Sequence, residues 1–62
     1  MNKVFEYSDQ DLGKSYLVVS HVREISKTLG DLVITFTNGD RKVLNVADAN
    51  ATLEQLLEAI RG

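Results

Sequence analysis

Only a few residues of this sequence have types and spacings that could do chemistry. Gly13-Lys14-Ser15 matches the last three positions of a phosphate-binding P-loop. The first glycine of that motif would be at position 8, where the chain has Ser8, and the carboxylate of Asp9 would repel phosphate. A P-loop is also followed by a helix, whereas the residues from Tyr16 onward are strand-like. We therefore interpret the segment as a surface loop.

The same loop begins like a calcium-binding loop. Asp9 and Asp11 have the right spacing, but Gly13 stands at the third ligand position and Ser20 at the position of the bidentate acid. The chain has no Cys and one His, while zinc normally takes three or four such ligands. We expect no metal and no other cofactor.

Ser20, His21 and Asp31 are the residue types of a nucleophilic triad. Neighbouring residues on a strand point to opposite faces, so Ser20 cannot easily present its hydroxyl to the ring of His21. A chain this short also has little room for a ligand pocket. The sequence therefore predicts a protein that is not an enzyme.

Length and charge limit the remaining classes. The 62 residues are enough for one domain, residues 1–62, and the formal net charge of -2 gives no general attraction for nucleic acid. The longest uninterrupted apolar stretch, Tyr16 to Val19, is far too short for a membrane span or for the apolar part of a signal peptide. We expect a cytoplasmic protein. A domain of this size buries only about 60% of its unfolded surface, which favours self-association.

The N-terminal half predicts short strands separated by a polar loop. Lys3–Tyr7 has strand-forming residues, and residues 8–14 form the loop. Tyr16–Val19 and Val22–Lys27 are also strand-like, with Ser20-His21 between them. The pattern leaves open whether Tyr16–Lys27 is one bent strand or two. Thr28 to Asp31 predicts a turn.

The clearest local signal is a β-hairpin from Leu32 to Val46. A two-residue turn at Asn38-Gly39 would place Leu44 on the face opposite Leu32. A three-residue turn with Gly39 as a left-handed bulge residue instead aligns Leu32 with Leu44, so that the large apolar residues share one side. We predict the bulged turn.

The C-terminal residues predict an amphipathic helix. Thr52 and Gln55 have the spacing of a capping box, and Gly62 follows where a helix would end. Leucine and isoleucine recur at intervals of three and four residues, which gives one apolar stripe. The stripe consists of Leu53, Leu56, Leu57 and Ile60. We expect it to form the core together with Leu32, Ile34 and Phe36.

The order of these segments resembles the small flagellar FlbD-type proteins over residues 16–60. The residues that carry the resemblance are Tyr16-Leu17-Val18-Val19, Val22-Arg23-Glu24-Ile25, Val33-Ile34-Thr35-Phe36-Thr37-Asn38-Gly39, and the stripe from Leu53 to Ile60. The sequence departs from that family at Lys3–Gly13, an acidic strand and loop. The resemblance implies a small accessory or regulatory protein and supplies no catalytic residue.

The predicted fold is α+β: a three- to four-stranded antiparallel sheet with one C-terminal helix packed on one face. Apolar residues exceed what the helix can cover. We therefore predict a non-catalytic interaction or regulatory protein that self-associates as a dimer or small oligomer, or binds a protein partner. The predicted interface consists of Tyr16, Val18, Val33, Thr35 and Val43.

Nucleic-acid binding is the alternative. Single-strand binders combine basic side chains with an aromatic platform. Lys14, Arg23 and Lys27 could form such a patch beside Tyr16.

Overall fold

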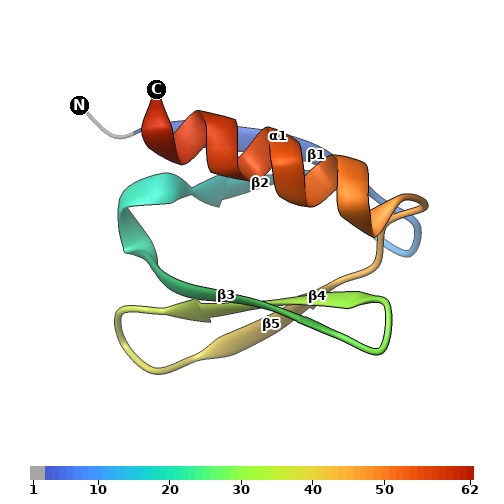
Figure 1. The fold of residues 1–62 in the computed structure, drawn as a ribbon, viewed down its shortest axis with the longest axis horizontal. Coiled ribbons are helices and arrows are strands. Elements are labelled where there is room, and N and C mark those ends of the chain that lie inside the picture. Colours follow the sequence, from blue (N-terminus) through green and yellow to red (C-terminus); the bar gives the residue numbers. More distant parts are fainter. Residues whose placement is uncertain (1–2) are drawn as a thin grey trace.

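Five antiparallel strands and one helix make up residues 3–62, the part of the chain that the computed structural model describes (Figure 1). The elements in chain order are β1 (Val4–Asp9), β2 (Gly13–Val18), the short 3₁₀ turn η1 (Val19–His21), β3 (Val22–Thr28), β4 (Asp31–Phe36), β5 (Arg41–Leu44) and α1 (Ala49–Arg61). The α+β class is as predicted. The strands, however, form two sheets, β1-β2 and β3-β4-β5, rather than one.

The division into two sheets occurs at η1. The chain leaves β2 at Val18, turns through Val19–His21, and starts β3 at Val22. The N–H of Thr37 donates to the carbonyl of His21 over 2.8 Å, so the turn is attached to the end of β4. A bulge at Arg23 follows immediately. Tyr16–Lys27 is therefore two strands that belong to different sheets.

The bulged turn between β4 and β5 is confirmed. Leu32 lies opposite Leu44, and Ile34 lies opposite Lys42. The N–H of Phe36 donates to the Asp40 carbonyl over 2.8 Å, and Gly39 has a φ of 93°. A positive φ at this position is what glycine adopts without strain, and it brings the apolar residues of both strands to one face.

The turn between β3 and β4 is tighter. Thr28 pairs with Asp31, which leaves only Leu29 and Gly30 in the loop. Their φ values are 51° and 88°, the pattern of a type I′ hairpin turn. The first position of a type I′ turn usually holds glycine, asparagine or aspartate, so a leucine at position 29 is unusual.

The helix begins earlier than the sequence predicted. Asp48, not Thr52, is the N-cap: its carboxylate accepts the N–H of Ala51 over 3.0 Å. Thr52 lies within the helix, and its own N–H donates to the Asp48 carbonyl. Asp is among the best N-cap residues, and the residues that follow it include two alanines with high helix propensity. The C-terminal end is as predicted, because the Gly62 N–H donates to the Glu58 carbonyl over 2.8 Å.

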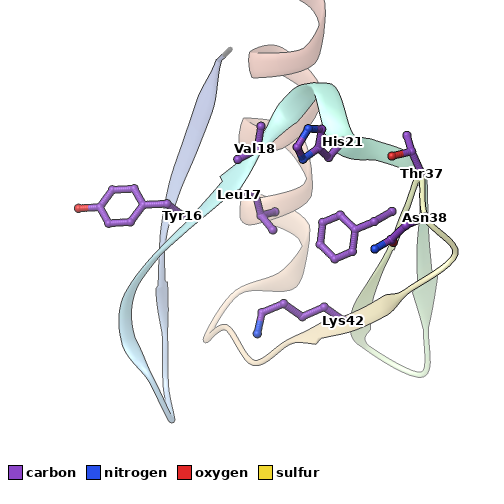
Figure 2. Close-up of a pocket in the computed structure, with 8 residues that line it drawn as sticks. Tyr16, Leu17, Val18, His21, Thr37, Asn38 and Lys42 are labelled. Carbon is purple, nitrogen blue, oxygen red and sulfur yellow. The ribbon is translucent and has the colours of Figure 1, made fainter.

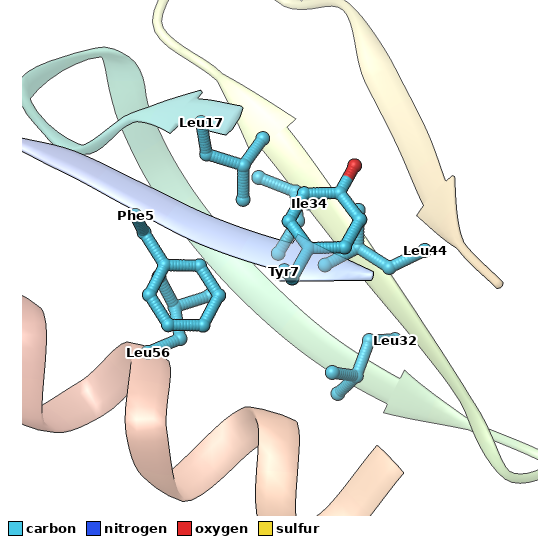
Figure 3. Close-up of a cluster of buried hydrophobic side chains, with 7 residues drawn as sticks. All are labelled: Phe5, Tyr7, Leu17, Leu32, Ile34, Leu44 and Leu56. Carbon is cyan, nitrogen blue, oxygen red and sulfur yellow. The ribbon is translucent and has the colours of Figure 1, made fainter. Parts of the chain in front are cut away.

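The core lies between the three-stranded sheet and a second layer made of β1-β2 and α1 (Figure 1). Its buried side chains come from both sheets and the helix (Figure 3). They are Phe5, Tyr7, Leu17, Leu32, Ile34, Leu44 and Leu56. The sequence suggested that the helix alone covers one face of the sheet. In the structure, the β1-β2 hairpin covers part of that face as well. The stacked rings of Phe5 and Tyr7, with centroids 6.2 Å apart, share that role.

The helix also presents a different face from the predicted stripe. Leu56 is fully buried, and Ala49, Leu53 and Ala59 pack beside it. Leu57 is only half-buried, and Ile60 is 42% exposed. The prediction that Ile60 is core was wrong, because the face of the helix that meets the core is centred on Leu56 and includes Ala49, Leu53 and Ala59.

This orientation gives the first prediction. Leu56→Ala leaves a cavity in the core and should cost about 2–5 kcal/mol, comparable to the whole stability of so small a domain. Ile60→Ala on the same helix should cost about 0.5 kcal/mol, as exposed positions usually do. Urea unfolding followed by circular dichroism measures both, and equal losses would contradict the observed helix orientation.

Candidate functional site

A groove opens between the two sheets at the end of the molecule where η1 lies (Figure 2). Its volume is about 450 Å³, within the range of ligand pockets, but it is open to solvent rather than enclosed. The lining residues come from β2, η1, the turn after β4, and β5. They are Tyr16, Leu17, Val18, His21, Phe36, Thr37, Asn38 and Lys42.

One side of the groove is an unpaired strand edge. Among residues 3–62, β1 is the only strand that pairs with β2, and the N–H of Val19 donates to the Lys3 carbonyl over 2.9 Å. Bonded and non-bonded pairs alternate along an antiparallel ladder. The backbone groups of Lys14, Tyr16 and Val18 therefore point away from β1, and those of Tyr16 and Val18 are beside the groove.

The groove combines an apolar floor with a basic rim, whose charge comes from the ammonium of Lys42. Leu17 and Phe36 are its apolar lining on the two sheets. Figure 2 shows His21 above Leu17. The side chain of Lys42 extends from β5 toward the β1-β2 hairpin, whereas the Tyr16 ring points away from the centre. The Asn38 side chain makes two hydrogen bonds within its own turn, each 3.0 Å long. Its Nδ2 donates to the Asp40 carboxylate, and its Oδ1 accepts the Asp40 N–H. The groove thus suits an apolar group accompanied by negative charge.

A buried carboxylate joins the two sheets at the opposite end. Asp9 is 6% exposed, and its Oδ1 accepts the N–H groups of Asp11 and Leu12 over 2.8 and 3.0 Å. Its Oδ2 accepts the Asn45 N–H over 3.4 Å. Two further bonds connect the same segments, each 2.7 Å long: Gln10 N–H to the Asn45 carbonyl, and the Asn45 amide to Asp11. We call this set of contacts the Asp9 junction.

The junction explains the residues that resembled phosphate- and calcium-binding loops. The carboxylates of Asp9 and Asp11 accept protein N–H groups, so they hold the turn and its neighbour in place. The Lys14 Nζ lies 3.6 Å from the Glu6 Oε2 across the β1-β2 hairpin. Within residues 3–62, no three His, Asp or Glu side chains are grouped closely enough to hold a metal ion.

The triad residues are not brought together. Ser20 and His21 lie in η1, before β3, whereas Asp31 begins β4 at the far end of the β3-β4 hairpin. His21 instead lines the groove. The Ser20-His21 interruption between two apolar runs was the signal in the sequence that could have indicated this corner.

The predicted interface residues fall on two separate surfaces. Tyr16 and Val18 lie on β2 at the groove, with Tyr16 58% exposed. Val33 and Val43 face each other on the outer side of the three-stranded sheet, and Val43 is 55% exposed. The two faces point away from each other across the core.

Thr35 cannot belong to an exposed interface. It is only 4% exposed on the central strand β4. Its neighbours on the two flanking strands are Glu24 and Arg41, whose longer side chains lie on the same face. The prediction for Thr35 was therefore wrong, although the outer face itself is open.

The three basic residues also lie apart. Lys14 starts β2 beside Glu6, and Arg23 is at the bulge where β3 begins. Lys27 is near the opposite end of β3, where its ammonium donates to the Asn50 side chain. Two of the three thus have partners within the chain, and in the described part of the structure the three do not form one patch beside Tyr16.

The sequence matches no protein-family model, and comparisons with curated proteins and with solved structures likewise give no match. The resemblance to FlbD-type proteins stays a prediction. In the described residues, no helix is long and apolar enough to cross a membrane.

The Asp9 junction predicts a specific pH dependence of stability. The Asp11 N–H, helped by those of Leu12 and Asn45 and by the charge of Lys42, lowers the pKa of Asp9 despite the opposing effect of burial. Because the folded pKa lies below the unfolded value of about 3.9, this stabilisation is complete above that value and is lost as pH falls through the folded pKa.

Asp9→Asn should therefore lower the Tm at pH 7, and the difference from the wild type should shrink as pH falls below about 4. Thermal unfolding at several pH values measures this. Glu54→Gln, at an exposed carboxylate on α1, is the control and should keep the wild-type profile. A constant difference between Asp9→Asn and wild type at every pH would exclude the ionised junction.

Proposed function

We propose that this chain is a non-catalytic, cytoplasmic interaction or regulatory protein, and that the groove between its two sheets is the contact surface. The observation that supports this most directly is the combination of an open β2 edge with an apolar floor and a basic rim. An unpaired strand edge offers main-chain hydrogen bonds, and adjacent pockets select the side chains of a bound segment.

The distribution of apolar residues supports the same function. Seven hydrophobic side chains are buried in the described chain, yet six large ones are exposed. These six are Val4, Leu12, Tyr16, Leu29, Val43 and Ile60. Single exposed apolar residues are normal. In so small a domain, however, burying them in a contact would add a large share to the free energy of unfolding. Self-association is therefore the first interaction to test.

Two matched substitutions test the groove as the contact surface. Val18→Asp places a carboxylate at the groove, whereas Val43→Asp makes the same change on the outer sheet face. Neither valine belongs to the buried core. Light scattering over a concentration series should show a mass above that of the monomer for wild type and Val43→Asp, and the monomer mass for Val18→Asp.

A photo-crosslinking amino acid at His21, an exposed residue that lines the groove, provides the second measurement. In cells that make the protein, it should form a defined adduct, either with another copy or with one other protein, and Val18→Asp should abolish that adduct. Unchanged adducts and unchanged mass in Val18→Asp would contradict the proposed function. So would a wild-type protein that is monomeric throughout and forms no adduct.

A further inference from the structure

The end of the molecule opposite the groove carries exposed leucines beside acidic residues. Leu29 is 100% exposed at the β3-β4 turn and is followed closely by Asp31. Leu12, at the β1-β2 turn, is 68% exposed and follows Asp11. Figure 1 shows both turns, together with the connection from β5 to α1, at one end of the molecule. We call this the acidic end, because its carboxylates (Asp9, Asp11, Asp31 and Asp48) outnumber its ammonium groups (Lys14 and Lys27).

Leu29 is held in a conformation that the isolated chain does not favour. Its φ of 51° is the one positive φ of a non-glycine residue among residues 3–62. Asparagine, aspartate or glycine would satisfy this turn with less strain. Since the side chain touches no other part of the fold, neither its shape nor its hydrophobicity stabilises the monomer. An exposed, strained residue of this kind is a reason to look for a contact outside the molecule.

The groove and the acidic end are complementary in chemistry and lie at opposite ends of β4. Phe36, Thr37 and Asn38 line the groove where β4 ends, whereas Leu29 precedes its start. The six residues of β4 separate them by about 20 Å at 3.3 Å per residue, in a molecule 29 Å long. The groove has an apolar floor with Lys42 and His21, and the acidic end has leucines with Asp31 and Asp11.

We propose that the acidic end of one copy docks into the groove of a second copy, with Leu29 inserted between Leu17 and Phe36 and Asp31 facing Lys42. This inference rests on the proposed function of the groove and specifies its occupant. Because two different surfaces of the chain meet, the contact is head-to-tail, and it generates a ring if the rotation closes or a filament if it does not.

The first experiment replaces the inserted leucine. Leu29→Asn suits the type I′ turn better, so the dilute monomer should melt at a higher temperature than the wild type. The same variant should lose association in light scattering. Greater stability together with lost association separates a docking role from a role in folding. Leu12→Asn, on the neighbouring turn, is the control for removing a leucine from this end and should retain most of the association.

Mixing two variants tests the head-to-tail geometry. Leu29→Asn keeps an intact groove, and Val18→Asp keeps an intact acidic end. Each should be monomeric alone, and an equimolar mixture should form a complex of one copy of each, with no larger species. Asp31→Lys and Lys42→Glu should each weaken association at low salt, and their combination in one chain should restore it.

The outcomes distinguish this inference from the proposed function. A wild type that stays monomeric, or a Leu29→Asn variant that retains the wild-type mass, overturns the head-to-tail contact. If Val18→Asp then still abolishes association or the His21 adduct, the groove remains the contact surface with a different occupant. If Val18→Asp changes neither, both proposals fail.

Discussion

The arrangement of this molecule depends on the Asp9 junction. One carboxylate accepts N–H groups from its own turn and from Asn45, a residue 36 positions further along the chain. At the other end, η1 connects the two sheets through the backbone itself. The two sheets are thus joined at both ends, but β2 forms no ladder of hydrogen bonds with a strand of the three-stranded sheet. The groove is the opening that these two connections leave between them.

The small size of the chain makes this junction important. The three-stranded sheet offers Leu32, Ile34 and Leu44 as one apolar face, and a single helix contributes only one fully buried residue, Leu56. The face is covered because the β1-β2 hairpin brings Phe5 and Tyr7 over it. The junction positions that hairpin, so a buried polar contact holds the apolar layers in register. Its bonds to backbone N–H groups compensate for the desolvation of the carboxylate.

Sequence patterns predicted the features that follow from local constraints. The bulged turn at Gly39 was predictable because only one register places Leu32 opposite Leu44. The helix was predictable as an element, but its start and buried face were not. Asp48 competed with Thr52 as the cap, and the packing of the helix against both sheets turned Ala59 rather than Ile60 toward the core. The second sheet was not foreseen, because the contact between Asp9 and Asn45 has no local signature.

The candidate site was predictable only in part for the same reason. Tyr16 and Val18 were selected as an exposed apolar pair, and they lie at the groove. Val33, Thr35 and Val43 were grouped with them because a single sheet would have placed all five together. Once the strands form two sheets, those residues occupy the opposite outer face, and His21 and Lys42 take part in the groove instead. The five predicted residues are separated because the strands form two sheets, and non-local contacts determine the number of sheets.

The energetics of Leu29 limit what kind of association the groove can support. Fully burying a leucine side chain contributes about 1.5–3 kcal/mol, whereas association costs at least about 4 kcal/mol in lost translation and rotation. Leu29 alone therefore cannot hold two copies together, and the neighbouring charges and the backbone and side-chain contacts around the inserted leucine must add to the association. Charge pairs at an exposed rim contribute about 0–1 kcal/mol each. A head-to-tail contact of this composition is weak and reversible, so assembly depends on protein concentration and becomes persistent only if the chain of contacts closes into a ring.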